Sequence, residues 1–91
     1  MLYREALGEV LRELRTDKRK NLADVSEYVS IAHLSEIERG HNEVSSEVLE
    51  TIANGLGVTV YDIVTLAGWK LQTSNEKQNS PTRLDKVSFT R

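Results

Sequence analysis

The chain has 91 residues, of which 38% are hydrophobic, 29% are charged and 5% are aromatic, and it contains no cysteine. This length suits one small domain whose core is built mainly from Leu, Ile, Val and Ala. Disulfides, thiolate metal sites and cysteine nucleophiles are excluded. No apolar run approaches the roughly 20 residues that span a bilayer, and the start of the chain lacks a signal-peptide pattern. We therefore expect a cytoplasmic protein with no membrane partner.

The net charge of −2 hides an uneven distribution of charged residues. Basic side chains gather between positions 12 and 20, whereas acidic side chains gather between positions 36 and 50. The basic run could be a solvated helix end, where cations favour the C-terminal dipole, or part of an anion-binding surface. The sequence leaves both interpretations open. The basic residues of the run are Arg12, Arg15, Lys18, Arg19 and Lys20.

The first element is a predicted amphipathic helix over residues 2–17. Gly8 lies inside it at a cost of about 1 kcal/mol relative to Ala, which indicates close approach of a neighbouring helix. The apolar residues at helical spacing are Leu2, Ala6, Leu7, Val10, Leu11 and Leu14.

Residues 21–40 read as two short helices with almost no turn between them. Asn21 is a good N-cap, with Asp24 in the first turn, and Ser30 can cap again. Gly40 is the expected left-handed stop. The inward residues change phase after Val29, which favours two helices over one. The inward residues are Leu22, Val25 and Val29 in the first helix and Leu34 and Ile37 in the second.

Two further helices complete an all-α domain of five helices over residues 1–72. Ser45 or Ser46 caps the fourth helix, Gly57 ends it, and Thr59 with Asp62 opens the fifth. From Thr73 the chain is polar, and we expect a flexible tail over residues 73–91. The expected inward residues of these helices are Val48, Leu49, Ile52, Ala53 and Leu56, then Val60, Ile63, Val64, Ala67 and Leu71. Leu66 and Trp69 lie off that stripe, and Gly68 leaves the length of the last helix open.

Four stretches in this order resemble the Cro/CI-type (XRE) helix-turn-helix regulators: LGEVLRELR, NLADVSEYVS, HLSEIERG and VLETIANGLGVTVYDIV. Within that family, SEIERGHNEVSSEVLETIA resembles the ClgR group, which regulates proteolysis (Clp) genes in actinobacteria. The resemblance implies a five-helix DNA-binding domain with a C-terminal dimerisation helix. It also implies a transcriptional regulator, either an activator or a repressor, that binds double-stranded DNA as a dimer on palindromic operators and could contact RNA polymerase, with no enzyme activity, cofactor or metal.

One departure from the family concerns the turn. Family members usually have two more residues, often including Gly, between the equivalents of Tyr28 and Val29, and no residue here adopts positive φ cheaply. The turn could be tight and strained, or the second helix could lose its last turn. Alternatively the two helices could fuse into one rod, which would favour domain swapping or a higher oligomer.

The resemblance assigns site residues to three roles. The second helix of the pair would lie in the major groove. Base readout is expected from Ser30, Ile31, Ala32, Ser35, Glu36 and Arg39, although Arg39 could equally support the fold. Phosphate contacts are expected from Arg15, Lys18, Arg19, Lys20, Asn21, His41 and Asn42. Dimerisation is expected through Tyr61, Leu66 and Trp69, unless Trp69 caps the core of the monomer.

The alternative is an antitoxin or a helical protein–protein interaction module, in which the tail would fold onto a partner. An enzyme is disfavoured because so small a helical domain leaves little room for a pocket of convergent titratable groups. His33 and Glu36, with His41 nearby, form only a weak metal-binding pattern.

Overall fold

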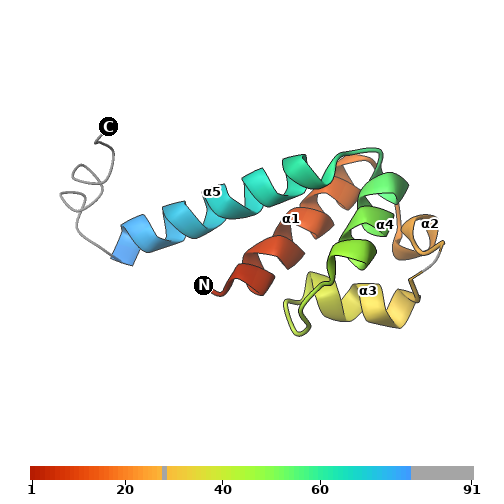
Figure 1. Cartoon of the computed structure of the whole chain (residues 1–91), viewed down its shortest axis with the longest axis horizontal. Coiled ribbons are helices and arrows are strands. Elements are labelled where there is room, and N and C mark those ends of the chain that lie inside the picture. The colour runs from red at the N-terminus through yellow and green to blue at the C-terminus, as the bar shows by residue number, and fades with distance from the viewer. Residues whose placement is uncertain (28, 79–91) are drawn as a thin grey trace.

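The computed structural model describes residues 1–27 and 29–78, with side chains up to Ser74. This part of the chain is all-helical, and the expected five helices are confirmed. They are α1 (Tyr3–Asp17), α2 (Leu22–Val25), α3 (Ile31–Glu38), α4 (Ser46–Leu56) and α5 (Val60–Gln78). In Figure 1, α2, α3 and α4 lie to one side of α1, while α5 runs beside α1 and continues past it.

The helix ends lie where capping chemistry predicts them. The Asn21 side chain accepts from the Asp24 N–H at 2.9 Å and the Asp24 carboxylate accepts from the Asn21 N–H at 2.8 Å, a reciprocal capping box. Thr59 and Asp62 repeat this arrangement at the start of α5. Ser45, and not Ser46, caps α4. Gly57 ends α4 with φ of +73°.

The core forms where α1 meets the other helices. Its largest fully buried side chains are Val10, Leu11, Ile37, Ile52, Leu56 and Ile63. Gly8 lies where α1 crosses the end of α3: a Cβ there would clash with the Ile37 carbonyl oxygen and lie 2.7 Å from the Glu38 carbonyl oxygen. The expected reason for a glycine inside this helix is therefore confirmed. It lets the two backbones approach closely.

The shortened turn is accommodated by a short second helix. Helix α2 ends at Val25 after four residues, and α3 begins at Ile31. The prediction that α2 and α3 could fuse into one rod is wrong. A helix continued from Val29 would turn Ala32 and His33 inward, whereas Ala32 is exposed and Leu34 and Ile37 are buried. Domain swapping or a higher oligomer, which a short hinge could also favour, stays a prediction.

Three local expectations are corrected. Leu2 is exposed because it precedes the first turn of α1, outside the face that meets the core. Val64 is exposed because α5 packs on one side only, with Ile63 and Ala67 at the centre of the contact. Helix α5 continues through Gly68 to Gln78, six residues beyond the expected end of the domain at residue 72. The rest of the expected tail, residues 79–91, lies outside the described residues.

Candidate nucleic-acid interface

Helix α3 separates a buried face from an outward face. Leu34 and Ile37 are buried and fix the helix to the core. Ile31 and Ala32 are exposed, and Ser35 is half-buried. An outward helix face of small and apolar residues on a rigid base is the shape that fits a major groove.

Ser30 begins α3 and serves as its cap. Its hydroxyl oxygen accepts from the His33 N–H at 3.1 Å, so its own O–H remains able to donate to a base. Ser30 is exposed at the N-terminal end of the helix, as a base-reading role requires.

Charged residues meet at the other end of α3. Glu36 Oε1 lies 2.9 Å from His41 Nδ1, and Glu36 Oε2 lies 3.3 Å from Arg39 Nη1. All three side chains are partly exposed. The three predicted DNA contacts therefore form one hydrogen-bonded cluster in the free protein.

Arg15 has a different role from the phosphate contact expected for it. Its Nε and Nη2 donate to the two oxygens of Glu38 at 2.7 and 2.9 Å, and its Nη1 donates to the Lys20 carbonyl oxygen at 2.9 Å. Only 15% of the Arg15 side chain and 11% of the Glu38 side chain are exposed. The hydrogen bonds to Glu38 raise the pKa of Arg15, so the guanidinium is held charged. Arg15 braces α1 against α3, and Glu38 is its partner.

Other expected phosphate contacts lie in the connection before α2 and in the segment after α3. Lys18 and Arg19 are exposed and Lys20 is half-buried in the connection from α1 to α2, where Arg19 adopts φ of +58°. His41 is exposed and Asn42 half-buried after α3. Sequence reasoning left Arg12 out of the site, although it belongs to the basic run. Arg12 lines a hollow of about 290 Å³ with Leu22, Ser35 and Arg39, which places it beside the outward face of α3.

Asn21 precedes α2, but two N–H groups at this helix start are already used. The Asn21 and Asp24 N–H groups are donated within the capping box, and the Asp24 carboxylate adds a negative charge there. Asn21 is exposed, and its side-chain amide and the N–H groups of Leu22 and Ala23 take no part in the capping box, so these are the groups that could face a phosphate.

An apolar surface lies on the side of α5 away from the core. Tyr61 is 77% exposed and Trp69 is 68% exposed, with Leu66 and Val64 also exposed. Trp69 therefore does not cap the core of the monomer. Tyr61 and Trp69 lie two turns apart on α5, so they can present one face to a partner.

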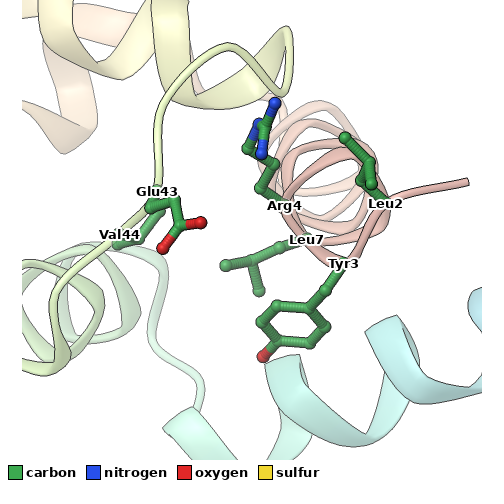
Figure 2. A pocket seen from close by; sticks show the side chains of 6 residues that line it. All are labelled: Leu2, Tyr3, Arg4, Leu7, Glu43 and Val44. Atoms are coloured by element: carbon green, nitrogen blue, oxygen red, sulfur yellow. The ribbon is translucent and has the colours of Figure 1, made fainter.

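A second hollow, of about 300 Å³, lies on α1 beside the segment that follows α3. Figure 2 shows Arg4 extending from α1 toward the loop after α3, with Tyr3 and Leu7 below it and Glu43 and Val44 opposite. Arg4 Nε donates to the Gly40 carbonyl oxygen at 3.0 Å. The residues that line this hollow support the end of α3 and do not contribute to its outward face.

The described residues contain no group of three or more His, Cys, Asp or Glu side chains that could hold a metal ion. Within the same part of the chain, no helix combines the length and the apolar character needed to cross a membrane.

The fold, with a short helix pair whose second member stands outward on a buried base, is that of a helix-turn-helix domain. The helix-turn-helix family model matches residues 11–63, and the chain belongs to this family. Its resemblance to the ClgR group is also confirmed. It is 40% identical over 72 residues to the transcriptional regulator ClgR of Mycobacterium tuberculosis, covering 77% of this chain and 64% of that protein. It is 38% identical over 60 residues to the HTH-type transcriptional regulator DdrOP3 of Deinococcus deserti, covering 64% of this chain and 46% of that protein.

Solved structures give the same result. One crystal structure of the clp gene regulator ClgR from C. glutamicum has a TM-score of 0.73 at 44% identity, covering 77% of this chain and 94% of that one. A second, from Corynebacterium glutamicum, has a TM-score of 0.77 at 39% identity and covers 100% of this chain and 98% of that one. The chain spans just under two thirds of the length of the M. tuberculosis relative.

Proposed function

We propose that this protein binds double-stranded DNA in a sequence-specific manner through α3 and thereby regulates transcription. The observation that carries the proposal is the outward face of α3, exposed at Ile31 and Ala32 and anchored from below by Leu34 and Ile37. A helix with an immobile base and an outward face of small side chains can enter a major groove without rearrangement.

The residue types on this face suit base edges. Ile31 and Ala32 can contact a thymine methyl group, and Ser30 and Ser35 can hydrogen-bond several bases. Arg39, at the last turn, can reach O6 and N7 of guanine or a phosphate. Glu36 lies between them, and its Oε2 pairs with Arg39 while its Oε1 contacts His41 Nδ1.

Phosphate contacts come from the rim of this face. The exposed cations belong to the connection before α2, the polar residues follow α3 in the chain, and Arg12 lines a hollow beside the outward face. Each neutralised phosphate releases counterions, so the affinity should fall steeply with salt. The proposed contacts are Arg12, Lys18, Arg19, Lys20, Asn21, His41 and Asn42.

We extend the proposal to a dimer formed through Tyr61, Leu66 and Trp69 on α5, which would bind a palindromic operator. The half-sites of such an operator would be about 34–36 Å apart. Since the two similar solved structures are both of a clp gene regulator, we propose genes of the Clp proteolysis system as targets.

The test is selection of bound duplexes from a random pool, followed by gel shift of the selected sequence over a salt range of roughly 50 to 300 mM. We expect one enriched palindrome. We also expect the logarithm of the binding constant to fall linearly with the logarithm of the salt concentration. Binding without any base preference at every salt concentration would refute the proposal. Ala32→Glu tests whether the outward face of α3 contacts DNA, because it places a carboxylate on that face without touching the core.

A further inference from the structure

The carboxylate of Glu36 is shared between two basic side chains, one on each oxygen. Oε1 contacts His41 Nδ1 at 2.9 Å, and Oε2 contacts Arg39 Nη1 at 3.3 Å. Arg39 follows Glu36 by three residues, so the two lie on the same side of the helix end. His41 lies beyond the helix, and its side chain returns to Glu36.

The backbone fixes this return. The His41 N–H donates to the Glu36 carbonyl oxygen at 3.0 Å, and the Gly40 N–H donates to the Ile37 carbonyl oxygen at 2.9 Å. This pair of bonds, around Gly40 at φ of +76°, is a Schellman motif. Gly40 is itself packed on Glu5, whose Cα would lie 2.8 Å from an added Cβ. The position of His41 beside Glu36 is therefore set by the fold.

A carboxylate in this position is unsuited to read DNA alone. It would add a negative charge close to the phosphates, and the favourable contact available to it is the N4 amino group of cytosine. Here both oxygens already accept from groups that can themselves approach DNA. The same contacts restrict the long Arg39 side chain, which otherwise samples many rotamers.

We propose that Glu36 is a positioning residue that holds Arg39 and His41 for DNA contact, and that it does not itself read a base. This inference rests on the proposed function, since it concerns the same interface. In this proposal Arg39, and not Glu36, discriminates between bases. His41 contacts a phosphate from a position that Glu36 holds.

The experiment is a double-mutant cycle on the selected duplex, with Glu36→Ala, Arg39→Ala and the double variant. Affinity and base preference are measured for each against every single base-pair change in the operator. Glu43→Ala is the control: Glu43 is an exposed carboxylate just after α3 that makes none of the ion pairs found among the described residues. It corrects for the loss of one negative charge near DNA.

We expect Glu36→Ala to lower base discrimination about two- to fivefold at the same base pairs as Arg39→Ala, as an exposed ion pair allows, and the double variant to match Arg39→Ala. If Arg39 contacts a phosphate, the same non-additivity should appear in the affinity and in its salt dependence. Glu43→Ala should raise the affinity for all sequences and leave base preference unchanged. His41→Ala should weaken binding equally for all sequences, and less so in the Glu36→Ala background.

Three results would overturn the inference while leaving the proposed function intact. They are loss of discrimination by Glu36→Ala at a base pair that Arg39→Ala leaves unaffected, full additivity of the two substitutions, or identical behaviour of Glu36→Ala and Glu43→Ala. Absence of base preference in the unmodified protein would refute the proposed function, and the inference with it. Circular dichroism of each variant confirms that it is folded, and Glu36→Gln repeats the cycle without removing side-chain volume.

Discussion

Glu38→Gln should destabilise the protein strongly, because it removes the negative partner of a mostly buried Arg15. The two side chains are 15% and 11% exposed and make a bidentate contact at 2.7 and 2.9 Å. Loss of one partner from a fully buried pair costs about 3–5 kcal/mol, and an exposed pair contributes under about 1 kcal/mol. Because the pair is slightly exposed and Arg15 keeps its bond to Lys20, we expect an intermediate loss of about 2–3 kcal/mol.

The measurement is urea unfolding followed by circular dichroism, at one fixed protein concentration because dimerisation would add to stability. In thermal unfolding the same loss should lower Tm by about 10–20 °C for a domain of this size. Glu43→Gln, at an exposed position, should change stability by less than about 0.5 kcal/mol.

The companion variant separates charge from packing. Arg15→Met with Glu38→Met leaves no unpaired charge, so the double variant should recover to within about 1 kcal/mol of the unmodified protein. A loss below about 0.5 kcal/mol for Glu38→Gln would show that the pair does not brace α1 against α3. A double variant no more stable than Glu38→Gln would show that unpaired charge is not the cause.

Other expected outcomes concern the remaining helices. In the same urea assay, Gly8→Ala should cost about 2–3 kcal/mol because the added Cβ would push α1 away from α3. Gly68→Ala should instead stabilise α5 by about 0.5–1 kcal/mol, because an added Cβ there meets nothing within 4 Å. Equal effects of the two substitutions would contradict this. The hydrogen bond to Glu13 is the main cause that raises the pKa of Lys70, so its contribution should be complete below pH about 10.4 and disappear as the pH rises through the higher folded-state pKa. The Tm difference between the unmodified protein and Lys70→Met should therefore shrink as the pH rises above the ordinary pKa of a lysine, and a difference that does not change with pH would refute this. Trp69→Ser should weaken dimerisation about 30-fold in sedimentation, while a monomeric unmodified protein would refute the α5 dimer surface.

Local chemistry made the helix boundaries predictable from sequence. Asn21 with Asp24 and Thr59 with Asp62 are three residues apart, so their capping bonds depend on no other part of the fold. The buried face of α3 followed from helical spacing for the same reason. The family resemblance then supplied the position of the candidate DNA interface, which spacing alone would not have given.

The remaining features depend on tertiary structure. The pairing of Arg15 with Glu38 joins residues 23 positions apart, so a basic run alone gave no sign that this arginine is taken up internally. The exposure of Val64 depends on which side of α5 meets α1. Arg12 was missed because its place beside Ser35 arises only when α1 and α3 pack together. The length of α5 stayed open at the sequence level because neither Gly68 nor a polar composition by itself ends a helix.

The bond from Arg4 to the Gly40 carbonyl oxygen has a consequence for genetics. It ties the first turn of α1 to the end of α3, across 36 positions of the chain (Figure 2). Gly40 in turn has no room for a side chain against Glu5. Alleles at positions 4, 5 and 40 would therefore share a phenotype with alleles of Arg39, although their side chains support α3 from beside it. A map of alleles that reduce DNA binding would therefore include residues that support α3 as well as residues on its outward face. Only the salt dependence and base preference of each allele would distinguish the supporting residues from the contacting ones.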